Sequence, residues 1–224
     1  MNSQPSHRIR VWDLPTRLFH WALVGLVCGS FVTAKVGGNL MVWHSRLGYA
    51  ALTLLLFRAV WGVVGSRYAR FATFVRGPSA VRAYLRGDPA WVDRPGHNPL
   101  GALSVVAMLG AVGLQAATGL FATDEIAFEG PLAARVSEAT SLALTTVHGL
   151  GEKAILALVA LHVLAVAYYR FARGRDLIRP MLTGDASAAP GSVPARDDAA
   201  TRALALVLLA FCAGAVAWLV GRGG

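Results

Sequence analysis

The chain has 224 residues, of which 55% are hydrophobic and only 15% are charged, with a mean hydropathy of +0.53. A soluble domain must cover its surface with polar side chains, so this composition excludes most soluble classes and indicates a membrane protein. The net charge of +9 could attract nucleic acid, but the basic residues lie in loops between apolar runs. Basic loops of this kind are typical of membrane topology signals. We therefore expect membrane lipid, and no nucleic acid, as a partner.

Five apolar runs are each long enough to cross a hydrocarbon core about 30 Å thick. In chain order the runs cover about 14–34, 41–64, 98–121, 142–171 and 202–220. Asp13 precedes the first run and Asn98 opens the third, and proline follows each closely, a pattern typical of helix N-caps. Residues 78–87 mix apolar and basic side chains after Pro78, which favours a short interfacial helix whose arginines reach anionic headgroups.

The segment 183–201 is rich in Ala, Pro, Ser, Gly and Asp, a composition typical of a flexible linker. We therefore predict an all-α integral membrane protein with three parts. These are a four-helix transmembrane domain at 1–182, a flexible linker at 183–201, and a C-terminal transmembrane helix at 202–224.

The basic residues are distributed unevenly between the two sides of the predicted spans. One side has Arg8, Arg10, Arg17, Arg67, Arg70, Arg76, Arg82, Arg86, Arg94, Arg170, Arg173, Arg175, Arg179, Arg196 and Arg202. The other side has Lys35, Arg46, Arg135, Lys153 and Arg222. Because basic loops remain in the cytoplasm, we expect a cytoplasmic N-terminus and a C-terminus on the opposite side.

Four histidines lie inside the apolar runs, where an ionisable side chain is costly and indicates a function. His148 and His162 are fourteen residues apart, about 40° short of four helical turns, so they share one helix face. Their separation along the axis is about 21 Å, which places one in each leaflet. The direction of the spans then puts His20 level with His162 on the inner side, and His44 level with His148 on the outer side.

Two histidines on facing helices at one depth can bind the iron of a haem from both faces. The chain has no Cys-x-x-Cys-His motif, so a haem would be bound without thioether bonds. A zinc or non-haem iron site would need three or four ligands in one shell, and no carboxylate lies mid-span to complete either pair. Each histidine could instead be a hydrogen-bonded core residue. Two depth-matched pairs favour two haems.

Haem propionates are anionic and require basic partners near the membrane surfaces. Arg46 and Lys153 could serve the outer haem, and Arg17 and Arg58 the inner one. Arg58 lies well inside a span and is the basic residue that we most expect to bind a propionate. Plain interfacial anchoring explains the other three equally well. His97, at the entrance of the third span, could gate protons for a quinone near the inner surface or cap that helix, and we favour the cap.

Several motifs also occur in a known order. They are VWDLPTRLFHW at 11–21, WHSRLGY at 43–49, WGVVGSRY at 61–68, GHNPLG at 96–101 and TGLF at 118–121. Over about residues 8–182 the chain resembles the prokaryotic cytochrome b561 family, which includes the b-type cytochrome subunits of nickel–iron hydrogenases.

The resemblance implies a four-helix core in a bacterial inner membrane, and the distribution of basic residues then places the C-terminus in the periplasm. It implies two b haems, with His20, His44, His148 and His162 as the iron ligands. It also implies electron transfer across the bilayer between the quinone pool and a redox partner. That partner could be a hydrogenase or dehydrogenase subunit, or a c-type cytochrome. The fifth span lies outside the region of resemblance.

Two other functions remain open. The chain could be a superoxide:quinone oxidoreductase, since Lys35, Arg46 and Lys153 could attract the superoxide anion; the acidic residues Asp124 and Glu125 on the same side argue mildly against it. It could also be a scaffold or transporter without haem, although no internal repeat of the transporter kind is present. We assign no catalytic residue from the sequence.

Overall fold

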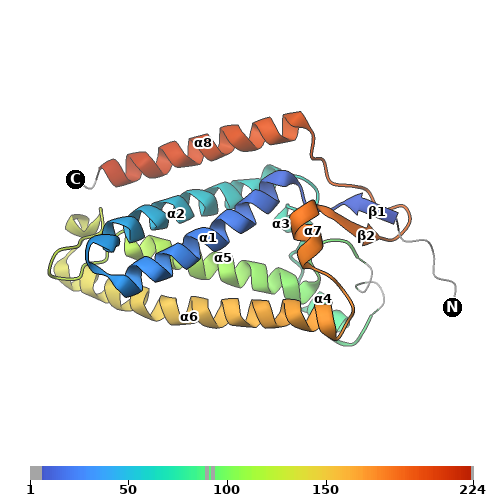
Figure 1. The fold of residues 1–224 in the computed structure, drawn as a ribbon, viewed down its shortest axis with the longest axis horizontal. Helices are drawn as coiled ribbons and strands as arrows, with labels where there is room; N and C mark the ends of the chain where they lie inside the picture. The colour runs from blue at the N-terminus through green and yellow to red at the C-terminus, as the bar shows by residue number, and fades with distance from the viewer. Residues whose placement is uncertain (1–6, 89–90, 92–93, 223–224) are drawn as a thin grey trace. The chain divides into compact units, whose positions relative to one another are not determined.

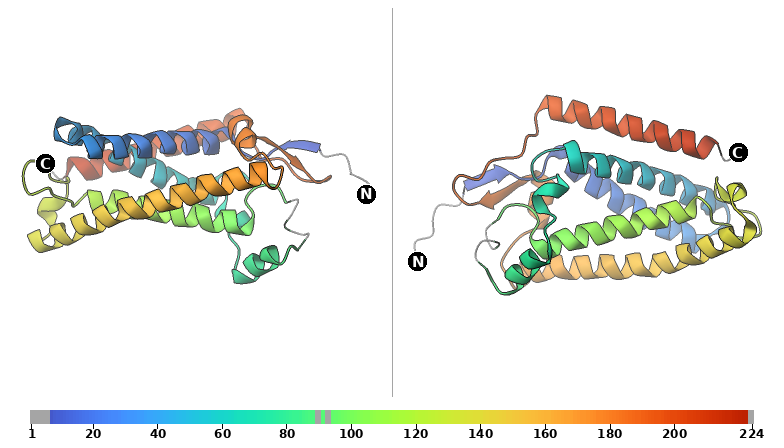
Figure 2. Two further views of the ribbon diagram at one scale, coloured as in Figure 1. Left: turned by 60° about the horizontal axis from the view of Figure 1, so that its bottom comes forward. Right: turned by 180° about the vertical axis from the view of Figure 1, so that it is seen from behind.

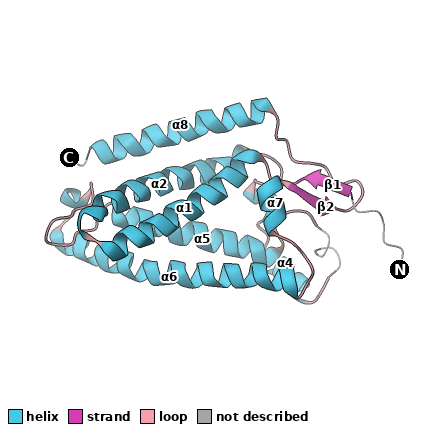
Figure 3. Ribbon diagram, viewed as in Figure 1, coloured by secondary structure: helices cyan, strands magenta, loops and turns pink. Residues whose placement is uncertain are grey.

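The computed structural model describes residues 7–88, 91 and 94–222. Helices dominate this part of the chain, and a single pair of strands accompanies them (Figures 1 and 3). Among the described residues, five helices are long and apolar enough to cross a membrane. They are α1 (Leu14–Val36), α2 (Met41–Val64), α5 (Pro99–Gly119), α6 (Glu138–Phe171) and α8 (Ala199–Gly221). The prediction of an all-helical membrane protein with five spans is confirmed.

The connecting segments contain shorter elements. These are η1 (Gly38–Leu40), α3 (Phe71–Phe74), α4 (Pro78–Leu85), η3 (Ala133–Arg135) and α7 (Ile178–Thr183). The strands β1 (His7–Arg10) and β2 (Asp185–Ala188) pair antiparallel, with His7 opposite Ala188 and Arg10 opposite Asp185. Both views in Figure 2 show β1 beside β2.

The described chain forms two compact units. Unit 1 comprises Met1–Leu18, Arg58–Ala107 and Ala160–Leu206, and unit 2 comprises Phe19–Phe57, Met108–Val159 and Val207–Gly224. Each of the five long helices contributes one part to each unit. These two units do not coincide with the domains predicted at 1–182 and 202–224. The predicted division into those domains remains a prediction.

Unit 1 has a small apolar core beneath the two strands. Ile9, Val11, Trp12 and Ala188 are buried there, and Tyr68 packs against them. Apolar side chains from β1 and β2 therefore share one core, which gives the β1–β2 pair a hydrophobic reason to form.

The segment from 183 to 201 differs from the flexible linker that its composition predicts. Residues 185–188 form β2, the amide of Ala195 donates to the Arg10 carbonyl at 2.7 Å, and the Tyr68 hydroxyl donates to the Val193 carbonyl at 2.8 Å. These partners are far away in the sequence, so composition within the segment gives no sign of them. Backbone pairing with the N-terminal strand orders residues that would otherwise have little side-chain surface to bury.

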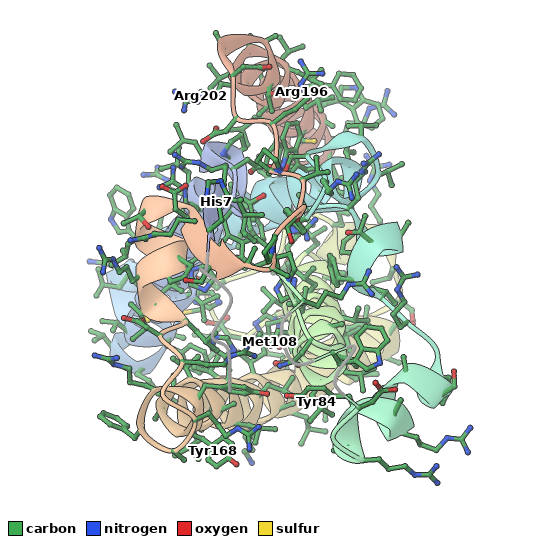
Figure 4. All side chains as sticks on the ribbon, turned by 90° about the vertical axis from the view of Figure 1, so that its right-hand side faces the viewer. His7, Tyr84, Met108, Tyr168, Arg196 and Arg202 are labelled. Atoms are coloured by element: carbon green, nitrogen blue, oxygen red, sulfur yellow. The ribbon has the colours of Figure 1, made fainter. Side chains whose placement is uncertain are left out.

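A buried carboxylate completes the attachment of this segment. The Asp197 side chain is only 7% exposed, and it accepts hydrogen bonds from the Leu14 amide and from Arg202 Nε at 3.0 and 3.1 Å. Arg10 lies 3.4 Å from the same carboxylate. Figure 4 labels Arg196 and Arg202 at the beginning of α8. We call Asp197 with Arg10, Arg17, Arg202 and the Leu14 amide the Asp197 cluster.

In unit 2, the connection between α1 and α2 reverses the chain at Gly37 and Gly38. Both have positive φ values, 68° and 56°, which a residue with a Cβ rarely adopts. The loop after α5 is also well connected: Asp124 Oδ1 accepts hydrogen bonds from the amides of Phe128, Ala127 and Ile126. These bonds hold the pKa of Asp124 below its usual value. Arg135 in this loop donates to the Arg222 carbonyl at 2.6 Å, which fixes the C-terminal end of α8 within the unit.

Candidate functional site

The rings of His44 and His148 are close neighbours in unit 2. His44 lies in the first turn of α2 and His148 in the first half of α6. Their ring centroids are 6.1 Å apart, and the ring planes make an angle of 84°. Both side chains are half-buried. The structure thus brings together the two histidines that the depth argument places on the outer side.

In both rings Nδ1 is hydrogen-bonded to a backbone carbonyl. His44 Nδ1 lies 2.9 Å from the Ser30 carbonyl oxygen, and His148 Nδ1 lies 3.0 Å from the Gln115 carbonyl oxygen. A carbonyl oxygen can only accept, so Nδ1 carries the hydrogen in each ring and Nε2 keeps its lone pair. This is the arrangement found in metal-binding histidines, whose second nitrogen donates to a carbonyl or carboxylate.

The distance between the rings fits a metal ion between them. A metal–imidazole bond is about 2 Å long and the ring centroid lies about 1.2 Å further, so two imidazoles on opposite sides of one ion have centroids about 6.4 Å apart. Within the described residues, no group of three or more His, Cys, Asp or Glu side chains could hold a metal ion. A metal bound here would take its other ligands from outside this set of side chains, and a haem is a cofactor that could supply them.

The close approach of α5 to His148 depends on a glycine. A Cβ on Gly119 would lie 2.9 Å from His148 Cε1 and 3.3 Å from its Nδ1. The Thr118 hydroxyl lies 3.2 Å from the same Nδ1. Gly119 therefore leaves room for the ring, while its neighbour and the Gln115 carbonyl orient it.

The other two span histidines belong to different units. His20, on α1 in unit 2, is half-buried with its ring edge-on to Trp21 at a centroid distance of 4.9 Å. His162, on α6 in unit 1, is also half-buried. Their pairing as ligands of one haem remains a prediction.

Arg58 lies in a buried polar cluster of unit 1. Its side chain is 3% exposed, its Nη2 donates to the Ala69 carbonyl at 3.0 Å, and its guanidinium carbon lies 4.6 Å from the centre of the Phe71 ring. Arg58 Nη1 is buried and has no hydrogen-bond partner. An unpaired, buried cationic donor is costly. A carboxylate such as a haem propionate would satisfy it, so Arg58 fits the role predicted for it.

Asp13 belongs to the same cluster and is fully buried. Its Oδ1 accepts from the Thr16 amide at 2.6 Å, which confirms the predicted N-cap. Its Oδ2 accepts from the Trp61 indole N–H at 3.2 Å and from the Ser66 hydroxyl. The charge of Asp13 also acts favourably on the Arg58 guanidinium. The sequence indicated only the cap, because nothing local to Asp13 points to Trp61 or Ser66.

The remaining basic candidates have other contacts. Arg17 Nη1 donates to the Leu182 carbonyl at 2.5 Å, and its Nη2 lies 4.0 Å from Asp197. Arg46 is exposed and lies 5.0 Å from the centre of the Trp43 ring, which is typical of interfacial anchoring. Lys153 is exposed. A propionate contact for these three residues remains a prediction.

His97 does not cap α5. The Asn98 side chain does so instead, because its Oδ1 accepts from the Gly101 amide at 2.7 Å. The His97 ring packs against Trp12 and Phe74, with centroid distances of 4.7 and 4.6 Å. Its role is therefore in the aromatic packing of unit 1.

Comparison with known proteins gives one match. A family model described as prokaryotic cytochrome b561 matches residues 11–184. No curated protein and no solved structure matches the chain. The matched region contains all four span histidines and Arg58, and it ends before α8.

Proposed function

The chain belongs to the prokaryotic cytochrome b561 family of membrane b-type cytochromes, and from this premise we propose that it passes electrons across the bilayer through two b haems. The electrons would move between the quinone pool and a redox protein partner at the outer face, such as a dehydrogenase or hydrogenase subunit or a c-type cytochrome. In this proposal the N-terminus lies in the cytoplasm and the C-terminus in the periplasm, as the distribution of basic residues favours.

The observation that carries the proposal is the arrangement of His44 and His148. Their ring centroids lie 6.1 Å apart, and each Nδ1 is committed to a backbone carbonyl. When bound, haem supplies one-electron oxidation and reduction. The carbonyls of Ser30 and Gln115 would keep the rings oriented and increase the basicity of Nε2, the atom that would bind the iron.

The second haem would be bound by His20 and His162 at the inner level. Arg58 supports this proposal because its buried Nη1 has no hydrogen-bond partner, and a propionate would supply one. Asp13 would hold Arg58 in place by its opposite charge. Two haems at two depths divide the distance across the membrane into shorter electron transfers.

The oxidation of superoxide is less well supported than electron transfer to a protein partner. Lys35, one of the basic residues that could attract superoxide, lies 2.6 Å from Glu152 Oε1. The paired carboxylate offsets the lysine charge, and Asp124 and Glu125 add negative charge in the same unit.

The decisive experiment is a haem count on purified protein. Wild type and the variants His20→Ala, His44→Ala, His148→Ala and His162→Ala are compared by pyridine haemochrome assay and by reduced-minus-oxidised spectra. We expect two haems per wild-type chain and the loss of one haem in each variant. His7→Ala is the matched control because His7 lies outside the spans, and it should keep both haems. A wild type without haem, or four variants that keep both haems, would disprove the proposal.

A further inference from the structure

The short helix α4 is held in place by three polar side chains. The hydroxyls of Tyr84 on α4 and Tyr169 on α6 are hydrogen-bonded to each other. Asn98 Nδ2 donates to both, at 3.2 Å to Tyr84 and 2.8 Å to Tyr169. All three residues belong to unit 1, and Figure 4 shows the labelled Tyr84 on α4 near the end of α6 that carries Tyr168. Tyr84 therefore attaches α4 to two spans at once.

These attachments determine the depth of α4 relative to a membrane. Asn98 immediately precedes α5, and Tyr169 lies in the last turn of α6, which ends at Phe171. The 21 residues of α5 are about the length that a hydrocarbon core of about 30 Å requires, so Asn98 is expected at the level of the lipid headgroups. Since Tyr84 contacts both residues, α4 lies at this level as well.

The two faces of α4 differ in chemistry. At 100° per residue, Tyr84 lies about 200° from Arg82 around the helix, whereas Arg86 lies only about 40° from Arg82. Arg82 and Arg86 are exposed, and Leu85 beside them is 66% exposed, while Ala80, Val81 and Tyr84 are partly buried. The face opposite the attachment therefore presents two guanidinium groups and one leucine.

We propose that this outer face of α4 binds anionic phospholipid of the cytoplasmic leaflet. Arg82 and Arg86 would contact the phosphodiester oxygens, and Leu85 would enter the boundary of the acyl chains. Guanidinium groups suit phosphate because they donate paired hydrogen bonds, and exposed leucine suits the acyl region but not water. Arg76 and Arg94, on the segments before and after α4, are also exposed and add positive charge to the same loop.

The test compares phospholipid binding by the full-length purified protein and its variants. Delipidated protein in neutral detergent is titrated with dioleoylphosphatidylglycerol or dioleoylphosphatidylcholine, and bound lipid is counted by native mass spectrometry. We expect wild type to bind phosphatidylglycerol more tightly than phosphatidylcholine. The double variant Arg82→Gln/Arg86→Gln should lose affinity for it by roughly five-fold for each arginine.

The matched control is Arg67→Gln/Arg70→Gln, which removes the same charge from exposed arginines of the same loop outside α4. It should retain the preference of wild type. Equal losses in the two double variants would show general attraction to charge and overturn the proposal, as would a wild type that binds both lipids equally. Competition with glycerol phosphate distinguishes a site for phospholipid from a site for any soluble phosphate ester. The proposal requires that an excess of glycerol phosphate does not displace the bound phosphatidylglycerol. Circular dichroism of both double variants shows that they remain folded.

Discussion

The indole N–H of Trp61 donates a hydrogen bond to the carboxylate of Asp13, with 3.2 Å between Nε1 and Oδ2. Both side chains are 0% exposed. The bond joins the residue before α1 to the last part of α2, and the same carboxylate supports the buried Arg58. One acidic side chain thus caps a helix, joins two spans and balances a buried cation.

Replacing Asp13 by Ala should therefore destabilise the protein strongly. The change leaves the buried donors of Thr16, Trp61 and Ser66 without their shared acceptor, and each buried donor left unpaired costs about 1–3 kcal/mol. The measurement is the free energy of unfolding from an SDS titration followed by circular dichroism. Ser66→Ala removes only one donor to the same carboxylate and should cost about 1 kcal/mol. Equal losses in the two variants would contradict a special role for the charge of Asp13.

The contact between Gly119 and His148 predicts a local effect on the proposed outer haem. In Gly119→Ala the new methyl group would lie 2.9 Å from His148 Cε1, so the ring must move. We expect a partial loss of one haem, or an altered low-spin haem signal in electron paramagnetic resonance spectra.

The control for this change is Gly113→Ala in the same helix, where nothing lies within 4 Å of the added Cβ. Alanine is the better helix former, so this variant should keep its haem content and its stability. If Gly119→Ala behaves like Gly113→Ala in both measurements, His148 does not need the space that this glycine leaves.

The Asp197 cluster predicts how the N- and C-terminal segments respond to pH. Burial raises the pKa of Asp197, but the hydrogen bonds from Arg202 and the Leu14 amide, with the charges of Arg202 and Arg10, outweigh it and lower the pKa. The folded pKa is below the ordinary value of 3.8, so the stabilisation is complete above pH 3.8 and is lost as the pH falls through the lowered pKa.

This pH response can be measured with a spin label at Ala189→Cys, introduced after Cys28 and Cys212 are replaced by Ser. Ala189 is exposed and follows β2 directly. The label should be restricted in motion at neutral pH and become mobile only below about pH 4. Adding Asp197→Asn should make it mobile at all these pH values. A label that is equally restricted in both proteins at neutral pH would show that the cluster does not hold this segment.

The proposed orientation predicts opposite results for two fusion proteins. Green fluorescent protein fused after Asp198, before α8, should fluoresce because it remains in the cytoplasm. When fused after Gly224 it should be dark, and alkaline phosphatase fused at the same position should be active. The reverse pattern would invert the orientation, and the inner and outer haem assignments with it.

The spans could be predicted from the sequence because the bilayer requires long apolar runs. The predicted span at 41–64 has the same bounds as α2, and the span predicted from 202 begins only three residues earlier, at Ala199. The pairing of His44 with His148 also follows from local information, since helical period and span direction suffice to set their depths. The carbonyls of Ser30 and Gln115 that orient the rings could not be predicted, because every residue has a carbonyl.

Contacts between distant segments could not be predicted from the sequence. Arg8 and Asp185 are 177 positions apart, and the strands that contain them are four residues long without a strong alternating pattern. The same applies to Asp13, whose local sequence indicates a cap and nothing more. In each case the partner is selected by tertiary packing, which composition and periodicity do not describe.

The position of Asp197 has a practical consequence for shortening the chain. A protein ending at residue 182 would contain the complete set of span histidines, yet it would lack the only carboxylate within salt-bridge distance of Arg17 among the described residues. Arg10 and Arg17 would then repel each other beside an uncapped Leu14 amide. A poor yield of such a truncated protein would therefore be explained by the loss of the Asp197 carboxylate. It would say little about the contribution of α8, which is removed at the same time.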